Sequence, residues 1–264
     1  MDLGIANKTA VVTGADSGMG FQTARMLLEE GARVLIADQY SEQIEAAAAK
    51  LGSHGEVHGA LVDVTDLKSV EAMRDEAIGK LGHVDLLVHA AGITGATGMF
   101  HEIGDDGWHS TLETLLMGTV RVARAFIPGM VERGAGRIIL FGSEDALQPY
   151  PDELPYCAAK AGILNLAKGL SKTYAEKGVL VNAVSPAYIA TPMTDAMMEK
   201  RARENGTSFD EAIESFLKEE RPTLELKRRG EAEEVAAVCV FLCSKHASFI
   251  NFAQPTSNIW RRCV

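Results

Sequence analysis

The sequence has few cysteines, a deficit of basic residues and no long apolar run. Its 264 residues include only Cys157, Cys239, Cys243 and Cys263, whose spacing indicates no disulfide framework. The histidines form no HExxH motif and no Cys/His pair at zinc-ligand spacing, so no metal site is predicted. This scarcity argues against a small disulfide-stabilised or zinc-stabilised fold and is typical of a reduced protein, which we expect to be cytoplasmic.

Basic residues are outnumbered by acidic ones. There are 26 Lys and Arg against 36 Asp and Glu, which gives a formal net charge of −10. A nucleic-acid binder or a protein that docks on an anionic membrane needs a basic surface, so both classes are disfavoured. No window approaches the roughly 18 consecutive apolar residues of a membrane span, and residues 1–12 lack the pattern of a signal peptide. We therefore expect a small-molecule partner, with neither nucleic acid nor membrane.

Short apolar runs alternate with helix-length segments along most of the chain. Helices are predicted at Phe21–Glu30, Ser41–Leu51 and Asp66–Leu81, with Asp66 as an N-cap. Buried strands that alternate with helices predict an α/β fold, a doubly wound parallel sheet, and the chain has no linker that would divide it. We therefore treat residues 1–264 as a single domain. The predicted strands are Thr9–Thr13, Arg33–Ala37, Val57–Val62, Asp85–His89, Gly136–Phe141 and Val179–Val184.

A highly charged segment, residues 194–229, follows the sixth predicted strand. Ser208 and Glu211 within it form a capping-box pattern that starts an amphipathic helix. The apolar side of that helix is predicted to carry Phe209, Ile213, Phe216 and Leu217. A helix placed beyond the carboxyl ends of the strands is well placed to cover a ligand, so we predict a helical substrate lid. The alternative is a helix that only packs on the core.

A glycine-rich loop, residues 13–20 (TGADSGMG), joins the first strand to the first helix. Glycines at this point let the backbone turn tightly and approach a pyrophosphate that sits on the helix N-terminus. Asp38 ends the second strand and is followed by Gln39 and Tyr40, with no Arg or Lys. A carboxylate there can bind the ribose hydroxyls of NAD and would repel the 2′-phosphate of NADP. The loop and Asp38 together predict an NAD site, although Asp38 could also be a simple turn residue.

Tyr156 and Lys160 form a YxxxK pair, and Ser143 ends the fifth strand thirteen residues before the tyrosine. At this spacing the phenol and the ammonium lie on one helix face. A nearby cation stabilises phenolate, so we expect the pKa of Tyr156 to lie below its usual ~10. The strand end and the helix would bring Ser143 and Tyr156 together at the carboxyl edge of the sheet.

Together these motifs, with Ser185-Pro186 and Thr191-Pro192 further on, resemble the short-chain dehydrogenase/reductase family over residues 6–249. The resemblance implies a Rossmann fold, a nicotinamide cofactor and hydride transfer to or from a carbonyl carbon. It also implies Tyr156 as the acid/base, Ser143 as a hydrogen-bond partner of the substrate oxygen, and Lys160 as a ligand of the nicotinamide ribose. The predicted cofactor-binding residues are Gly14, Asp16, Ser17, Gly18, Met19, Gly20, Asp38, Gln39, Asp63, Val64, Ala90, Ala91, Gly92, Tyr156, Lys160, Pro186, Ala187, Ile189 and Thr191.

The sequence departs from the family pattern at four places. Leu115 stands where the family often has an asparagine that holds a water in the proton relay. The turn His89-Ala90 replaces two asparagines, and Ala187 replaces the glycine of a Pro-Gly pair. Residues 251–264 form an atypical tail, in which Pro255 falls inside the expected seventh strand. We therefore expect a poorly ordered or rebuilt sheet edge after Asn251, in a family whose members commonly form homo-oligomers, here a tetramer or a dimer.

These observations predict an NAD-dependent oxidoreductase that acts on the CH–OH group of a secondary alcohol or on the matching ketone, with oxidation favoured. A 3-oxoacyl-thioester reductase and a catalytically weak NAD-binding sensor or assembly protein are the alternatives. Most candidate pocket residues are apolar, which favours a cyclic or aromatic substrate. Glu144 either binds a substrate hydroxyl or is a solvated loop charge. The predicted substrate-binding residues are Thr94, Glu144, Tyr150 and Met193.

Overall fold

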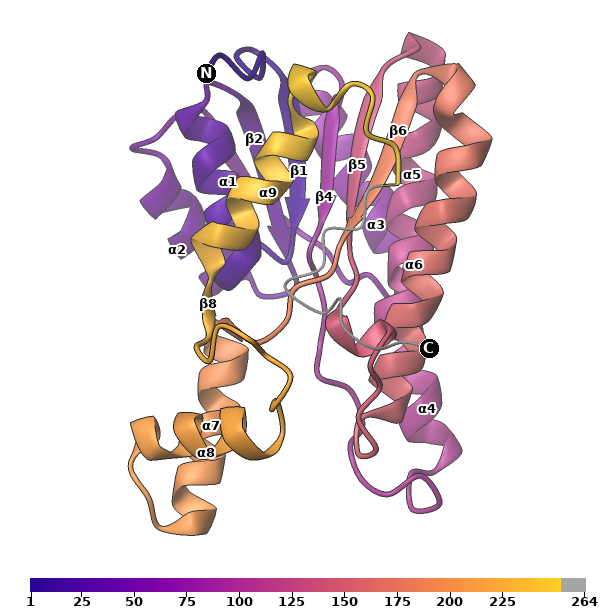
Figure 1. The fold of residues 1–264 in the computed structure, drawn as a ribbon. Coiled ribbons are helices and arrows are strands. Elements are labelled where there is room, and N and C mark those ends of the chain that lie inside the picture. The colour runs from indigo at the N-terminus through magenta and orange to yellow at the C-terminus, as the bar shows by residue number, and fades with distance from the viewer. Residues whose placement is uncertain (253–264) are drawn as a thin grey trace.

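The computed structural model describes residues 1–252 and has a parallel sheet at its centre (Figure 1). Within these residues the sheet has six strands, hydrogen-bonded in the order β3-β2-β1-β4-β5-β6. The strand order reverses between β1 and β4, and this reversal opens a crevice at the carboxyl ends of the strands. The strands are β1 (Thr9–Thr13), β2 (Arg33–Asp38), β3 (Val57–Leu61), β4 (Leu86–His89), β5 (Gly136–Phe141) and β6 (Val179–Val184).

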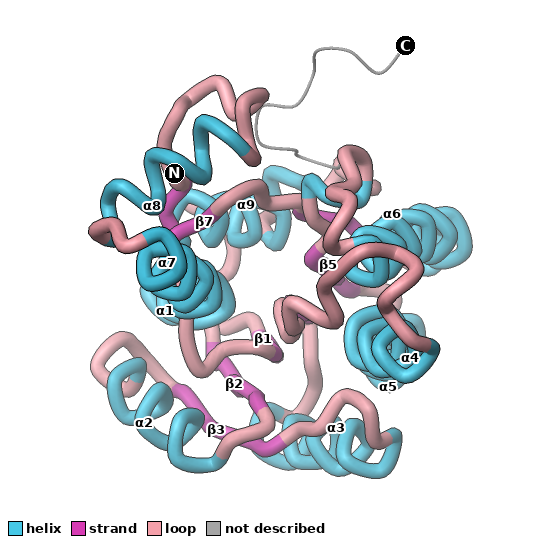
Figure 2. Tube along the Cα trace, turned by 90° about the horizontal axis from the view of Figure 1, so that it is seen from below, coloured by secondary structure: helices cyan, strands magenta, loops and turns pink. Residues whose placement is uncertain are grey.

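Helices cover both faces of the sheet (Figures 1 and 2). Successive strand side chains point to opposite faces, so Val12 packs with the first helix layer and Val11 with the second. Strands buried on both faces must be apolar throughout, which explains why they form continuous apolar runs in the sequence. The first layer holds α1 (Gly18–Glu29), α2 (Ser41–Leu51) and α9 (Ala232–Cys243), and the second holds α3 (Leu67–Leu81), α5 (Gly118–Arg133) and α6 (Leu154–Tyr174).

The predicted elements agree with the structure to within a few residues. Asp66 is confirmed as the N-cap of α3, because its carboxylate accepts a backbone N–H of the first turn. Strand β2 runs one residue further than predicted, since Asp38 pairs with Leu61 of β3. Asp85 lies outside β4, and its carboxylate accepts the N–H of Thr9 at 3.2 Å. The single-domain, doubly wound α/β sheet is confirmed.

After β6 the chain builds a helical excursion beyond the carboxyl edge of the sheet (Figure 1). We call residues 189–231 the lid segment. The sequence predicted one amphipathic helix here, whereas the structure has two, α7 (Pro192–Asn205) and α8 (Phe209–Glu219). Two short paired strands, β7 (Ile189–Ala190) and β8 (Gly230–Glu231), close the excursion at its base.

Helix α8 begins at the predicted capping box. Ser208 Oγ accepts the N–H of Glu211, and the Glu211 carboxylate accepts the N–H of Ser208 at 2.8 Å. Phe216 and Leu217 are buried as expected, but Phe209 is 37% exposed, because the apolar side of α8 is narrower than the sequence suggests. The lid segment packs on an apolar cluster that is separate from the two layers of the sheet. It is formed by Tyr188, directly before the segment, and by Met198, Phe216, Leu217 and Leu224 within it.

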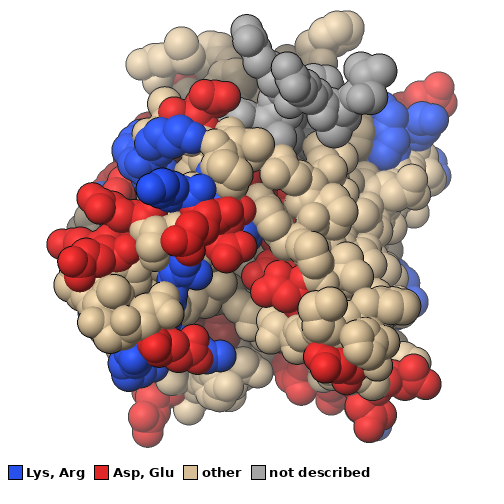
Figure 3. Space-filling model, turned by 60° about the horizontal axis from the view of Figure 1, so that its bottom comes forward, with Lys and Arg blue, Asp and Glu red and all other residues tan. Residues whose placement is uncertain are grey.

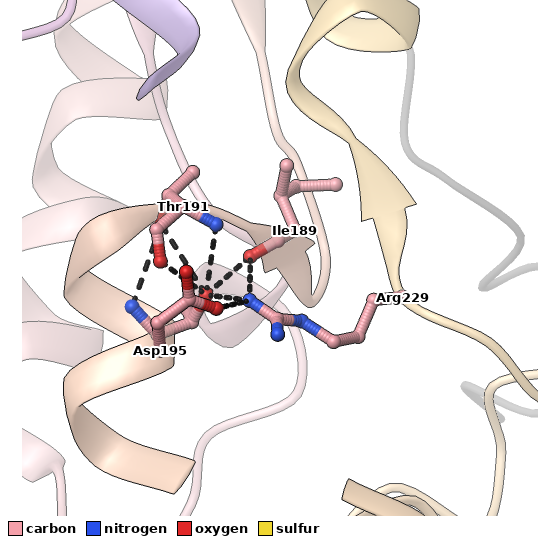
Figure 4. A network of polar contacts seen from close by, with 5 residues as sticks. Ile189, Thr191, Asp195 and Arg229 are labelled. Atoms are coloured by element: carbon pink, nitrogen blue, oxygen red, sulfur yellow. Dashed lines mark hydrogen bonds and ion pairs between the residues drawn. The ribbon is translucent and has the colours of Figure 1, made fainter. Parts of the chain in front are cut away.

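Arg229 ties the end of the lid segment to its beginning (Figure 4). Its Nη2 atom lies 2.7 Å from Oδ1 of Asp195 and donates to Oγ1 of Thr194 at 2.6 Å. The same nitrogen reaches the carbonyl oxygen of Ile189 at 3.4 Å. The Arg229 side chain is only 9% exposed, whereas that of Asp195 is 45% exposed, so the ion pair is shielded from water on the arginine side. The chain therefore returns from the lid segment to α9 at a fixed point beside the start of α7.

The outer surface of the lid segment carries charges of both signs, seen on the left of Figure 3. Arg201 of α7 is paired with Glu219 and Glu220 at the end of α8. Most of these carboxylates are exposed, and exposed ion pairs contribute little to stability. The charges keep this surface solvated, while the apolar cluster beneath them holds α7 and α8 together.

The stretch Asp105–Arg133 is the one helical segment of residues 1–252 that is long and apolar enough to cross a membrane. It consists of α4 (Asp105–Leu112), a single π-helical turn η1 (Glu113–Met117) and α5. Phe126 and Met130 of α5 are buried against Ile138 and Leu140 of β5. Because its apolar side packs on the sheet, we interpret the stretch as a core helix.

The described chain ends beside β6. The Asn251 carboxamide accepts the N–H of Val181 at 3.2 Å, and the Phe252 N–H donates to the carbonyl of Val181 at 2.9 Å. The sequence-based expectation for residues 253–264, which includes Pro255, falls outside the described residues. Among residues 1–252 there are also three short 3₁₀ turns, namely η2 (Glu144–Ala146), η3 (Ala175–Lys177) and η4 (Lys245–Ala247).

The capping box of α8 gives a stability prediction. Ser208→Ala removes the side-chain acceptor for the N–H of Glu211, and we expect the free energy of unfolding to fall by about 1 kcal/mol. The measurement is urea denaturation followed by circular dichroism. Thr207→Ala, at the exposed neighbouring position, is the matched control and should change stability by less than about 0.5 kcal/mol. Equal losses in the two variants would contradict the capping role.

Candidate active site

The loop between β1 and α1 is shaped for a close backbone approach. Gly14 has a φ of +68°, and a Cβ added to it would lie 2.5 Å from the backbone nitrogen of Ala91. A Cβ added to Gly20 would overlap the carbonyl oxygen of Gly14. The hydroxyl of Ser17, the N-cap of α1, donates to Asp16 and makes no capping bond to the helix. The first N–H groups of α1 therefore stay free to bind an anion.

The residues of the glycine-rich loop line a cavity of about 460 Å³ at the carboxyl edge of the sheet. The sequence also placed Pro186, Ala187 and Ile189 at the cofactor, but they line a separate cavity of about 230 Å³. The lining of the first cavity includes these predicted cofactor residues: Gly14, Asp16, Ser17, Gly18, Met19, Gly20, Asp38, Gln39, Asp63, Val64, Ala90, Ala91, Gly92 and Thr191. It also includes Tyr40, Val62, Thr65, Ile93, Thr114 and Pro192, which the sequence reasoning missed although most adjoin a predicted residue.

The charge of this cavity is negative. Asp16, Asp38 and Asp63 contribute carboxylates, and the described lining contains no Lys or Arg. Asp38 Oδ1 accepts the N–H of Gln39 at 2.7 Å. Burial raises the pKa of Asp38, and the hydrogen bond from Gln39 opposes that rise. One end of the cavity therefore offers a shielded carboxylate to a hydrogen-bond donor.

Ser143, Tyr156 and Lys160 meet beside β5. Ser143 follows the carboxyl end of the strand, while Tyr156 and Lys160 lie one turn apart on α6. The hydroxyl of Ser143 lies near enough to that of Tyr156 to lower the pKa of the phenol. Lys160 Nζ donates to the carbonyl of Phe141 at 2.9 Å and lies 5.4 Å from the centre of the Tyr156 ring. The predicted catalytic residues are thus brought together at one point.

The expectation that Lys160 lowers the pKa of Tyr156 is wrong for this structure. Burial raises the pKa of Tyr156 above its ordinary range, and the negative charges of Asp145 and Glu153 raise it further. The neighbouring hydroxyl of Ser143 lowers this pKa and only partly offsets these effects. Burial also lowers the pKa of Lys160 to about 8. The sequence pattern located the cation, but it gave no sign of the carboxyl groups nearby.

A charged cluster surrounds the hydroxyl end of Tyr156. Glu144 and Asp145 lie in η2, directly after Ser143, and Glu153 is the N-cap residue of α6. Arg221, from the lid segment, reaches Oε1 of Glu144 with its Nε atom at 3.4 Å, and both side chains are largely buried. Burial raises the pKa values of both Glu144 and Glu153 to about 7. The sequence reasoning named Glu144 alone among these four residues.

The predicted substrate residues separate into two groups. Glu144 and Tyr150 lie together, since the Arg221 guanidinium stacks 3.4 Å from the centre of the Tyr150 ring. Met193 lines the larger cavity, and Thr94 is exposed. Glu144 is therefore a buried, ion-paired residue, and the alternative of a solvated loop charge is wrong. Local sequence could not predict that Arg221 belongs to this site, because more than about seventy residues separate it from Glu144 and from Tyr150.

Two departures from the family pattern lie behind the cavity. Leu115, in the π-helical turn η1, is 1% exposed, and a Cβ on Gly92 would lie 3.3 Å from its Cδ2 atom. His89 is fully buried, its Nδ1 lies 2.7 Å from Oγ1 of Thr13, and burial lowers its pKa to about 3. A neutral histidine and a leucine thus occupy positions where the resemblance leads us to expect asparagines.

The backbone packing of the loop predicts the outcome of adding one methyl group. In Gly20→Ala the new Cβ overlaps the Gly14 carbonyl, so the loop must shift away from the helix N-terminus. We expect binding of the predicted NAD to weaken by about tenfold or more, measured by isothermal titration calorimetry. Gly79→Ala on α3 is the control, since an added Cβ there meets no atom within 4 Å. Unchanged affinity in Gly20→Ala would contradict the close approach.

Comparison with known proteins agrees with this geometry. The family model of short chain dehydrogenases matches residues 8–202. The uncharacterized oxidoreductase YvrD of Bacillus subtilis is 33% identical over 251 residues, covering 95% of each chain. The 2-dehydro-3-deoxy-L-rhamnonate dehydrogenase (NAD(+)) of a Sphingomonas strain is 32% identical, covering 92% of this chain and 91% of that protein.

A solved structure with this fold is L-sorbose reductase from Gluconobacter frateurii in complex with NADPH and L-sorbose. It superposes with a TM-score of 0.93 at 30% identity, and covers 99% of this chain and 100% of that one. The likeness extends over the whole sheet, the glycine loop and the lid segment, and not over the nucleotide-binding half alone. The chain therefore belongs to the short-chain dehydrogenase family, with its Rossmann fold and its oxidoreductase chemistry on a nicotinamide cofactor.

Proposed function

We propose that the protein is an NAD-dependent oxidoreductase that interconverts a secondary alcohol and a ketone. The proposal rests on two observations: Ser143, Tyr156 and Lys160 gather at the carboxyl end of β5, and a cavity at the same edge of the sheet holds Asp38 and has no cation in its described lining. Tyr156 and Lys160 are not themselves part of that lining. An NADP site usually needs a basic partner for the 2′-phosphate. The NAD(+) named in the rhamnonate dehydrogenase agrees with this reading, whereas the sorbose reductase was solved with NADPH.

The residues of the cavity fit a dinucleotide. The space that side chains on Gly14 and Gly20 would fill is open to a pyrophosphate, which the free N–H groups of α1 would bind. Asp38 would accept the hydroxyls of the adenine-side ribose, and Lys160 would donate to those of the nicotinamide ribose. When bound, the cofactor supplies or accepts the hydride.

Tyr156 is the proton carrier of the reaction. Because its pKa is raised, the phenol is protonated at neutral pH, which is the form that donates to the oxygen of a ketone. Ser143 places its hydroxyl where it can donate to the same oxygen. Reduction is therefore the direction favoured by this protonation state, although the NAD preference alone favours oxidation. Oxidation needs the phenolate, so its rate should rise with pH.

The substrate side of the site has both apolar and charged groups. Leu147 and Met193 are about half exposed at 50% and 44%, and they suit the predicted cyclic or aromatic substrate. Glu144, held by Arg221, adds a carboxyl group that can accept a hydrogen bond from a neighbouring hydroxyl. We propose a small uncharged substrate. A homo-oligomeric state and a cytoplasmic location stay predictions.

The cofactor preference is tested by kinetics with both nucleotides. The protein should use NAD(H) with a kcat/KM at least about tenfold above that for NADP(H). Asp38→Ala should raise the KM for NAD(H) by about tenfold, because the ribose hydroxyls lose a charged acceptor. It should also reduce the preference for NAD(H) over NADP(H). Glu45→Ala on the exposed side of α2 is the control. A preference of the unaltered protein for NADP(H) would refute the cofactor assignment.

Substitution of Tyr156 tests whether the protein is an enzyme or a catalytically weak NAD-binding sensor. Tyr156→Phe removes only the hydroxyl and should lower turnover by about a thousandfold, while NAD affinity stays within about twofold. The assay is a panel of cyclic and aromatic secondary alcohols, polyols and a 3-oxoacyl thioester, followed at the absorbance of the reduced nicotinamide. Tyr174→Phe, at the other end of α6, is the control. Cofactor binding without turnover of any substrate by the unaltered protein would favour the sensor alternative.

A further inference from the structure

Arg221 reaches from the lid segment to the loop after β5, which carries Ser143. The two parts face each other across the carboxyl edge of the sheet (Figure 1). The Nε atom of Arg221 lies 3.4 Å from Oε1 of Glu144, the residue directly after Ser143. A second contact joins the same two parts, because Gln148 donates from Nε2 to Oγ1 of Thr223 at 3.2 Å. The lid segment therefore meets the loop beside the catalytic serine at a defined place.

The guanidinium of Arg221 is packed against two aromatic rings. It lies 3.4 Å from the centre of the Tyr150 ring and 4.9 Å from the centre of the Phe216 ring. A guanidinium stacked on a ring can still donate in its own plane. Nη1 uses this freedom and donates to the carbonyl of Glu220 at 3.2 Å. The side chain of Arg221 is 10% exposed and that of Glu144 is 7% exposed, so the ion pair is held away from water.

Two buried polar atoms of this cluster have no hydrogen-bond partner within residues 1–252. They are the Nε atom of Arg221 and the hydroxyl of Tyr150. The contact between Arg221 and Glu144 joins two charges but lacks the geometry of a hydrogen bond. Buried polar groups in native proteins are nearly always paired, because an unpaired one keeps the full cost of its lost hydration. The two atoms therefore indicate a place where a ligand supplies the partners.

The cluster lies next to the reacting groups. Glu144 adjoins Ser143, and consecutive Cα atoms are only about 3.8 Å apart. The carbonyl oxygen of Tyr150 lies 4.0 Å from Sγ of Cys157, the neighbour of Tyr156 on α6. A ketone whose oxygen meets Ser143 and Tyr156 therefore has its adjacent carbon within reach of the cluster.

The charges of the cluster favour an uncharged group that both donates and accepts. Arg221 contributes one cation, whereas Glu144, Asp145 and Glu153 contribute three carboxyl groups, and burial raises the pKa of each of the three. An anionic substituent would be repelled by the carboxylates, and a cationic one would compete with Arg221. A hydroxyl can donate to Glu144 while it accepts from Arg221, because it has one O–H and two lone pairs. A hydroxyl thus suits both members of the ion pair.

We propose that Arg221, Glu144 and Tyr150 bind a hydroxyl on the carbon next to the reacting carbonyl, so that the substrate is an α-hydroxy ketone or the matching vicinal diol. The inference rests on the proposed function, whose substrate class it narrows. A ketone without this hydroxyl leaves the buried Nε atom of Arg221 and the hydroxyl of Tyr150 unpaired. A site built to bind a hydroxyl rejects the analogue that lacks it, because its own polar groups then have no partner.

The test compares ketones that differ by one hydroxyl. The pairs are 2-hydroxycyclohexanone with cyclohexanone and 1-hydroxy-2-butanone with 2-butanone. We expect the hydroxylated member of at least one pair to have a kcat/KM about a hundredfold higher or more. In Arg221→Met this ratio should fall to about tenfold or less, because only the hydroxylated ketone loses a contact. A ratio near one for both pairs in the unaltered protein would overturn the proposal.

Three variants separate recognition of the hydroxyl from packing. Tyr150→Phe removes only the unpaired hydroxyl, so the preference should fall about fivefold to tenfold while thermal stability does not fall. Arg221→Lys keeps a cation opposite Glu144 but lacks the planar guanidinium, so the preference should fall although the charges stay paired. Arg203→Met on the exposed side of α7 is the matched control and should keep the ratio within about twofold. Equal losses for both ketones of a pair in Arg221→Met would assign Arg221 a packing role only and overturn the proposal.

A binding measurement distinguishes failure of this inference from failure of the proposed function. Tyr156→Phe with NADH present is titrated calorimetrically with each ketone, since this variant retains the cluster but hardly turns over. It should bind the hydroxylated member of the preferred pair at least about tenfold more tightly. If the unaltered protein reduces no ketone at all, the proposed function fails, and this titration still tests the hydroxyl site. Equal affinities within both pairs would overturn the hydroxyl site whatever the activity.

Discussion

The contact between the glycine loop and the turn after β4 is the constraint on which the site depends. At Gly14 and Gly20 the backbone of the first βα unit packs so closely on its surroundings that there is no room for a Cβ. This packing sets the position of the α1 N-terminus relative to Ala91 at the point where the strand order reverses. The nucleotide cavity, Asp38 at the end of β2 and the catalytic group beside β5 take their relative positions from the same sheet edge. The backbone therefore defines the shape of the nucleotide cavity, and side chains such as Asp38 supply its polar groups.

The second constraint is electrostatic. Three carboxyl groups, those of Glu144, Asp145 and Glu153, lie near one phenol, and burial raises the pKa of each of them. Burying like charges together is costly unless some of them are neutral or paired. Arg221 pairs with Glu144 and lowers the pKa values of Asp145 and Glu153 as well. Burial is the largest cause of the raised pKa of Tyr156, and the charges of Asp145 and Glu153 raise it further.

Local patterns in the sequence were enough to predict the strands of the sheet and the three residues Ser143, Tyr156 and Lys160. Thr9–Thr13 and Val179–Val184 have the same limits in the structure as in the prediction, because buried parallel strands leave an unbroken apolar signature. Ser143, Tyr156 and Lys160 were found because strand ends and helix spacing bring them together. The sequence did not predict the second lid helix or the contact between Arg221 and Glu144, because both depend on the three-dimensional path of residues 189–231. The direction of the Tyr156 pKa shift was not predicted, because the sequence shows neither the burial of the phenol nor the approach of Asp145 and Glu153.

The contact of Arg221 with the acid cluster links movement of the lid segment to proton binding. Arg229 fastens the base of that segment beside α7, whereas Arg221 reaches across to Glu144 and stacks on Tyr150. Arg221 lowers the pKa values of the acids that it faces, so any displacement that carries the guanidinium away must raise them. A displacement of the guanidinium would then be accompanied by proton uptake, and by thermodynamic reciprocity acidification would favour that displacement. The position of Arg221 and the protonation of the acids that it faces would then be two aspects of one equilibrium.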